Sequence, residues 1–299
     1  MQDPDNAAAA RDEAEEASAF SHPAVPPDVT AAYGDHPDQV VDFYAPRDGS
    51  FQGGESPAPL VVALHGGAWR APYDRLHLSP LCDFLARRGF AVANVEYRRG
   101  SSLPHQDADG PVAGRWPETF DDVAAAFDAL PALVAEHLPT ADARRVVALG
   151  HSAGGQLALW AAARHVLPAD ATWRTGAPPA LRGVVALAPI ADFALAEELG
   201  VCGGASAQLL GSEAGLFDER RPYADPALLL PTGIATTVVQ GRADTTVPFA
   251  LAEAYADAAA KAGEVVGVTF LEEVGHFPLI DPAADACAVV AEEIAQLAW

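Results

Sequence analysis

The fold is decided by positions 145 to 160, which read Arg145-Val-Val-Ala-Leu-Gly-His-Ser-Ala-Gly-Gly-Gln-Leu-Ala-Leu-Trp160. The apolar run 146–149 predicts a buried strand, and the Ala- and Leu-rich run up to position 164 predicts a buried helix. Between them lies a G-x-S-x-G turn, in which small residues leave room for a serine held on a sharp bend. Ser152 also lies at a helix N-terminus, where free N–H groups favour negative charge. The stretch predicts a nucleophilic serine; the alternative is a glycine-rich turn with an incidental serine.

Segments of strand and helix character alternate along the rest of the chain. We expect strands at 39–44, 60–64, 90–95, 183–187, 236–239 and 265–271, and helices at about 79–88, from 118 to a kink or stop at Pro131, at 248–262 and from Asp281 to the C-terminus. This alternation predicts an α/β fold with a mostly parallel central sheet and helices on both faces.

The alternating pattern fills one domain, at 29–299. Residues 1–28 are expected to form a flexible N-terminal arm. Within it, the Ala- and Glu-rich stretch 7–19 predicts a short helix without a large apolar face, and several prolines follow. The irregular stretch at about 189–233 is expected to be a short lid beside the site.

Charge and cysteine content restrict the classes of function. The chain of 299 residues has a formal net charge of −23, which argues against a nucleic-acid partner because a phosphate backbone attracts basic surfaces. No apolar run approaches the roughly 20 residues of a membrane helix, and no secretory signal is visible at the start. Three scattered cysteines are too few for a disulfide framework or a zinc site, so we expect a cytoplasmic protein without a metal ion.

A serine hydroxyl becomes a good nucleophile only when an oriented base accepts its proton. Asp244 and His276 each follow a predicted strand, and loops after strand ends gather at one edge of a parallel sheet. We therefore predict Ser152, Asp244 and His276 as a catalytic triad, in the order nucleophile, acid, base. Asp192, after the strand 183–187, is the rival for the position of the acid.

The segment His65-Gly-Gly-Ala-Trp69 follows the strand 60–64. Acyl transfer requires backbone N–H donors aimed at an oxyanion, and we assign these donors to Gly67 or Ala68 together with Ala153. His65 is expected to brace the loop. The candidate pocket residues, whose alternative role is packing, are Trp69, His151, Phe193 and Phe277; the side chain of His151 is expected to point away from Ser152.

The sequence resembles the esterase- and lipase-like α/β hydrolases, including kynurenine formamidase and bacterial carboxylesterases, in four motifs: His65-Gly-Gly-Ala-Trp69, Gly150-His-Ser-Ala-Gly-Gly155, Gly241-x-x-Asp244-x-x-Val-Pro248 and Gly275-His276. The resemblance covers about residue 30 to the C-terminus. It implies the α/β-hydrolase fold, a covalent acyl-enzyme, and no metal or organic cofactor.

Three functions remain open at this stage. The first is a serine hydrolase of small to medium carboxylic esters, acting on a small-molecule substrate, with a homodimer as a further possibility. The second is an arylformamidase that hydrolyses N-formylkynurenine. The third is a non-hydrolytic lyase or dehydratase on the same fold, which is disfavoured because all three triad positions are filled.

Overall fold

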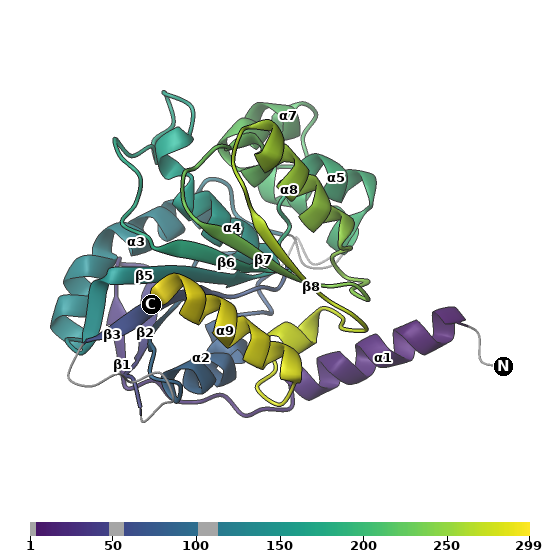
Figure 1. Ribbon diagram of the computed structural model, residues 1–299. Helices are drawn as coiled ribbons and strands as arrows, with labels where there is room; N and C mark the ends of the chain where they lie inside the picture. The colour runs from purple at the N-terminus through teal and green to yellow at the C-terminus, as the bar shows by residue number, and fades with distance from the viewer. Residues whose placement is uncertain (1–3, 48–56, 101–112) are drawn as a thin grey trace.

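A central sheet of eight strands organises the molecule (Figure 1), for which a computed structural model describes residues 4–47, 57–100 and 113–299. The strand order is β1-β2-β4-β3-β5-β6-β7-β8. The strands are β1 (Val29–Ala32), β2 (Val40–Tyr44), β3 (Ala58–Leu64), β4 (Ala91–Val95), β5 (Ala141–His151), β6 (Gly183–Leu187), β7 (Thr236–Gly241) and β8 (Gly267–Leu271). The β1–β2 and β2–β4 pairs are antiparallel, and every other pair is parallel. The mostly parallel α/β sheet expected from the sequence is confirmed.

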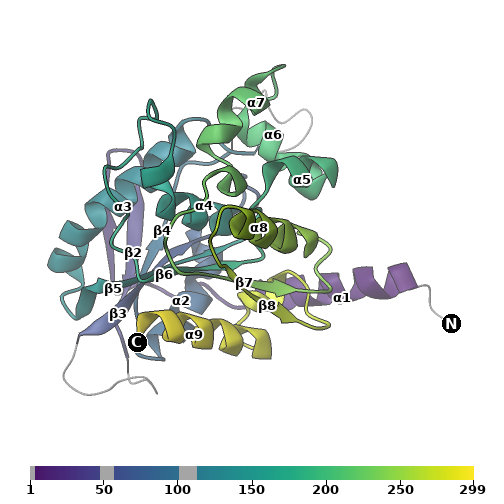
Figure 2. The same ribbon diagram turned by 45° about the horizontal axis from the view of Figure 1, so that its top comes forward.

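Helices cover both faces of this sheet (Figures 1 and 2). The helices α2 (Ser79–Ala86) and α9 (Asp285–Ala298) lie on one face, and α3 (Glu118–His137), α4 (Ala153–Ala162) and α8 (Ala250–Lys261) lie on the other. Side chains along a strand alternate between the two: Val146 and Ala148 of β5 join one core, and Val147 and Leu149 join the second. None of the helices formed by the described residues combines the length and the apolar character needed to cross a membrane.

The segment between β6 and β7 corresponds to the stretch at about 189–233, for which the sequence predicts a short lid. It contains α5 (Phe193–Glu198), α6 (Ala205–Leu210) and α7 (Leu216–Arg220), joined by 3₁₀ turns. Figure 1 shows α5 and α7 grouped beside α8, on one side of the sheet. The insertion adds a small helical layer to the same domain.

The structure differs from the sequence-based expectations at three helices. Pro131 lies inside an unbroken α3, because its missing N–H costs one backbone hydrogen bond while buried Phe120 and Val134 hold both halves of the helix to the core. The last helix begins at Asp285 instead of Asp281. The short helix expected at 7–19 extends over α1 (Pro4–Ala19), and its C-terminal half packs on the body instead of remaining a loose arm.

Candidate active site

Four loops meet at the edge of the sheet where the parallel strands end. Gly67 follows β3, Ser152 follows β5, Asp244 follows β7 and His276 follows β8. Because β3 and β5 are neighbours in the sheet, as are β7 and β8, the glycine loop lies beside the serine turn, and the acid loop lies beside the base loop. One cavity is lined by Ser152, His276 and Gly67 together.

The turn that carries Ser152 has a strained backbone, and there is no room for a side chain at its glycines. Ser152 has φ 56° and ψ −118°, a left-handed φ that costs energy in any residue with a side chain. A Cβ on Gly150 would lie 2.0 Å from the carbonyl oxygen of Gly154, and a Cβ on Gly154 would lie 2.1 Å from that of Leu64. The Ser152 N–H donates to the carbonyl of Leu187 at 2.8 Å, which fixes the turn to β6.

His276 and Asp244 form a buried hydrogen-bonded pair. Nδ1 of His276 lies 2.7 Å from Oδ2 of Asp244, and each residue is 5 % exposed. The other oxygen of Asp244 accepts the N–H of Val247 at 2.7 Å. With Nδ1 occupied by the carboxylate, Nε2 of the imidazole is left to exchange a proton. Asp192, the rival acid, instead caps the N-terminus of α5.

His151 lies against this pair rather than away from the site. Its ring centroid is 4.4 Å from that of His276, and its Nε2 donates to the backbone carbonyl of His276 at 3.1 Å. Burial, followed by the proximity of His276, lowers the pKa of His151 well below its usual value. A neutral His151 positions the His276 backbone and places no positive charge beside an imidazolium at 276.

The loop after β3, which the sequence predicts to carry oxyanion donors, has a left-handed backbone at two positions. Gly67 has φ 105° and Ala68 has φ 51°, and both residues line the cavity. Ala153 is the first residue of α4, so its N–H has no acceptor within the helix. The three candidate N–H donors therefore come from the turn that carries Ser152 and from the neighbouring loop after β3.

A buried ion-pair network supports the glycine loop from below. Nε2 of His65 lies 2.8 Å from Oε1 of Glu96, and its Nδ1 lies 2.8 Å from the carbonyl of Gly66. Tyr97 stacks on the His65 ring with centroids 4.3 Å apart. Burial alone would raise the pKa of Glu96, but the charge and hydrogen bond of His65, with Arg99, lower it to about 2. His65 thus braces the loop, as the sequence predicts.

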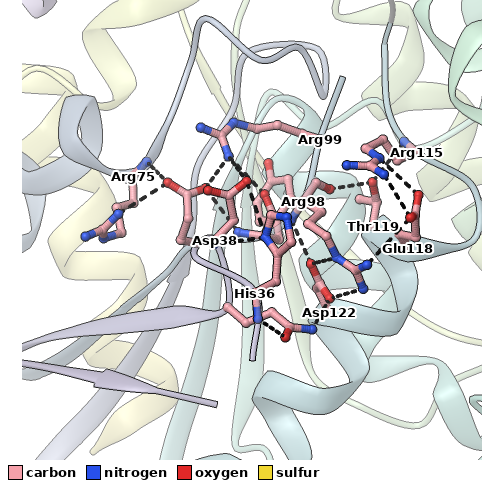
Figure 3. A network of polar contacts seen from close by, with 12 residues as sticks. His36, Asp38, Arg75, Arg98, Arg99, Arg115, Glu118, Thr119 and Asp122 are labelled. Carbon is pink, nitrogen blue, oxygen red and sulfur yellow. Dashed lines mark hydrogen bonds and ion pairs between the residues drawn. The ribbon is translucent and has the colours of Figure 1, made fainter. Parts of the chain in front are cut away.

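The same network extends to the start of α3 (Figure 3). Arg98 forms an ion pair with Asp122 at 2.7 Å and approaches Glu118 at 3.6 Å, and Arg115 pairs with Glu118 at 2.9 Å. These contacts tie the segment after β4 to α3. The residues that support the glycine loop are therefore held in place by both the segment after β4 and α3.

The cavity at the site has a volume of about 240 Å³. Its lining residues are Glu16, Phe20, Gly67, Ala68, Arg70, Tyr73, His77, His151, Ser152, Cys202, Thr246, His276, Phe277 and Ile280. Of the four predicted pocket residues, His151 and Phe277 are present. Trp69 and Phe193 are not: both are fully buried and pack edge to face with centroids 5.9 Å apart, because the Trp69 side chain enters the core beneath the loop.

Most of the other lining residues escape sequence reasoning. Tyr73 and His77 follow the glycine loop without any motif, Glu16 belongs to α1, and Phe20 is the first residue after it. The one available signal was Phe20, a large apolar residue at the end of a polar helix. Within the described part of the chain, no group of three or more His, Cys, Asp or Glu side chains is arranged to hold a metal ion.

Comparisons with known proteins agree with this fold. Residues 41–258 match the model of the BD-FAE family. A truncated carbohydrate esterase from gut microbiota superposes with a TM-score of 0.71 at 17% identity, covering 93% of this chain and 99% of that chain. Esterase B from Lactobacillus rhamnosis gives a TM-score of 0.69 at 18% identity, covering 98% and 92%.

A third solved structure, esterase 2 of Thermogutta terrifontis with bound propionate, gives a TM-score of 0.64 at 20% identity, covering 90% of this chain and 92% of that chain. A search of curated proteins finds no match. At these identities the structural likeness concerns the fold, and the α/β-hydrolase fold implied by the sequence motifs is confirmed.

Proposed function

This chain belongs to the BD-FAE family, and we propose that it is a serine hydrolase that cleaves carboxylic esters. The observation that carries the proposal is the meeting of three parts around one cavity: Ser152 on its strained turn, the His276–Asp244 pair, and the glycine loop. Each part supplies something that ester hydrolysis needs, namely a nucleophile, an oriented base and N–H donors for an oxyanion.

In the proposed reaction, Oγ of Ser152 attacks the ester carbonyl while Nε2 of His276 accepts the hydroxyl proton. Asp244 holds the ring through Nδ1 and stabilises the imidazolium. The N–H groups of Ala153 and of Gly67 or Ala68 bind the oxyanion. His276 then donates the proton to the leaving alcohol, and water hydrolyses the acyl-enzyme with His276 again acting as the base.

The cavity walls favour a small to medium substrate with an aromatic ring. Phe20 lies 6.2 Å from Tyr73 and 5.5 Å from Phe277 between ring centroids, and all three line the cavity. Burial lowers the pKa of His77 to about 3, so this lining imidazole is neutral. Aromatic walls hold planar groups through offset and edge contacts.

The three free cysteines fit the proposal of a cytoplasmic enzyme.

Replacing the nucleophile is the direct test. Ser152→Ala should lower kcat for phenyl acetate by about 10⁴-fold or more, because removing a triad member leaves only binding and the oxyanion donors. Ser212→Ala, at an exposed serine of the insertion, is the matched control and should retain wild-type activity. An active Ser152→Ala enzyme would contradict the proposal.

The aromatic walls are also compatible with the arylformamidase alternative, because N-formylkynurenine contains an aromatic ring. Comparing kcat/KM for N-formylkynurenine with kcat/KM for phenyl acetate separates the two activities, since the same triad serves both. A wild-type protein that hydrolyses neither compound and does not react with a fluorophosphonate would instead favour a non-hydrolytic function on this fold.

A further inference from the structure

The N-terminal helix contributes a wall to the cavity that contains Ser152. Glu16 and Phe20 line that cavity, although they belong to a segment that precedes the first strand. Figures 1 and 2 both show α1 outside the sheet, beside the loops that follow β8. Its first turns extend away from the body, and its second half lies against it.

The helix docks on residues that adjoin the acid and the base. The guanidinium of Arg11 donates to the carbonyl of Ala243 at 2.8 Å, next to Asp244 in sequence. On the other side of that aspartate, the hydroxyl of Thr245 donates to Asp12. Two consecutive residues of α1 thus contact the residues on either side of Asp244.

A third contact fastens α1 to the base loop. The N–H of Gly275 donates to the carboxylate of Glu15 at 3.3 Å. A Cβ on Gly275 would lie 2.0 Å from Oε2 of Glu15, so a side chain at this position would displace the Glu15 carboxylate. Burial raises the pKa of Glu15, which is further evidence of a closely packed contact.

The end of α1 and the chain that follows it are anchored by Asp281. Its two oxygens lie 2.6 Å from the hydroxyl of Ser18 and 2.7 Å from Nε2 of His22. Burial alone would raise the pKa of Asp281, but these hydrogen bonds and the N–H of Ala283 lower it. The anchor explains why Asp281 does not begin the last helix, and it fixes the position of Phe20 between Ser18 and His22.

Phe20 remains partly open although it contacts aromatic residues. Its side chain is 39 % exposed, and its ring lies 5.6 Å from His77 and 5.5 Å from Phe277 between centroids. A phenyl ring that lines the cavity, touches the other aromatic walls and still shows surface has area left for a ligand to bury.

We propose that α1 is an active-site cap that determines specificity, with Phe20 contacting the part of the substrate that lies beyond the scissile ester. Substrates with an aromatic ring reach this wall, and esters with only short alkyl groups do not. The proposal rests on the proposed function, because it takes the substrate to be an ester cleaved at Ser152.

Kinetics with matched substrates test the cap. Phe20→Ala should lower kcat/KM for phenyl acetate and ethyl 3-phenylpropanoate by about 10-fold, mainly through KM, and should change kcat/KM for ethyl acetate less than 2-fold, since truncating an aromatic contact removes binding of the ring alone. Leu228→Ala, at another exposed apolar side chain, is the control. Equal losses for all three esters, or no loss for any, would overturn the proposal.

A thiol gives a second measurement that needs no hydrolysis. Cys202 lines the cavity, whereas Cys82 and Cys287 are buried. In a Ser152→Ala background, Phe20→Ala should speed the alkylation of Cys202 by a bulky maleimide at least 5-fold, with the labelled site identified by mass spectrometry, and Leu228→Ala should leave the rate unchanged. An unchanged rate in the Phe20 variant means that the helix does not enclose the cavity. Faster labelling together with an inactive wild-type enzyme would reject the proposed function while keeping the enclosure.

Discussion

Glu96 is a residue on which the site depends although it does not line the cavity. It is 1 % exposed and accepts from His65, Arg99 and the N–H of Arg75. His65 begins the loop that carries Gly67. A buried carboxylate with several charged donors is costly to disturb, because each donor left without a partner remains out of water.

Glu96→Gln should therefore destabilise the protein by about 3 kcal/mol, measured by urea unfolding at pH 7. Because the folded-state pKa of Glu96 lies below its unfolded value, its contribution is full above the unfolded pKa and is lost as the pH falls toward 2. The gap between variant and wild type should close over that interval. Glu136→Gln, at a side chain that is 74 % exposed, should change stability by less than about 0.5 kcal/mol; a similar loss there would remove the special role of Glu96.

At the residue scale, the position of a side chain can be predicted where a motif coincides with a strand end. Ser152, Asp244 and His276 each follow a strand that the apolar pattern marks, so their loops had to gather at one edge of a parallel sheet. Glu96 also follows a strand, but no motif surrounds it. Its role in supporting the site depends on a contact with His65, which lies in another loop. Trp69 was placed wrongly because a sequence does not tell whether a loop side chain turns toward the cavity or the core.

At the scale of elements, the sequence predicts a short helix at 7–19 from its Ala and Glu content, but it does not predict that α1 docks on the body. Its sequence is rich in Ala and Glu, and the large apolar residue Phe20 comes directly after its last residue. Its docking depends on hydrogen bonds to backbone groups such as the carbonyl of Ala243 and the N–H of Gly275. Those groups are positioned only after the sheet has formed, so no local pattern in the helix indicates them.

The insertion between β6 and β7 holds a second electrostatic feature. Asp225 is 1 % exposed, and the nearest guanidinium nitrogen of Arg221 lies 3.9 Å from its Oδ2. Burial, followed by the charge of Asp192, raises the pKa of Asp225 to about 7. The folded insertion therefore disfavours the ionised form of the Asp225 carboxyl group at neutral pH.

The sign of the resulting pH dependence follows from linkage. Between the unfolded pKa near 4 and the folded pKa near 7, the folded state binds more protons at Asp225, so the free energy of unfolding should fall as the pH rises. Asp225→Asn should remove this part of the dependence and should be more stable than wild type by about 1–3 kcal/mol at pH 8. Asp35→Asn, at an exposed carboxyl, should run parallel to wild type in urea unfolding between pH 4 and 8. If the free energy of unfolding of Asp225→Asn also ran parallel to that of wild type between pH 4 and 8, the Asp225 carboxyl would be ionised throughout that range.

At the scale of the whole molecule, negative charge exceeds positive charge by 23. Several of the 18 basic side chains are already engaged in ion pairs, among them Arg75 with Asp42, Arg98 with Asp122 and Arg164 with Asp128. The remaining carboxylates give the molecule a negative field that reaches beyond its surface at low ionic strength. This field acts on any charged substrate before it touches the cavity.

An anionic ester should therefore be a poor substrate at low salt and a better one at high salt. The ratio of kcat/KM for 4-acetoxybenzoate to kcat/KM for its neutral methyl ester should rise about 3-fold or more between 20 and 300 mM NaCl, because screening weakens the long-range repulsion. The neutral ester corrects for effects of salt on the enzyme itself. The competing influence is Arg70, whose side chain lines the cavity and would attract a carboxylate at short range. If Arg70 dominated, salt would weaken that attraction and the ratio would fall, so the sign of the slope decides whether the net charge or the local guanidinium selects the substrate.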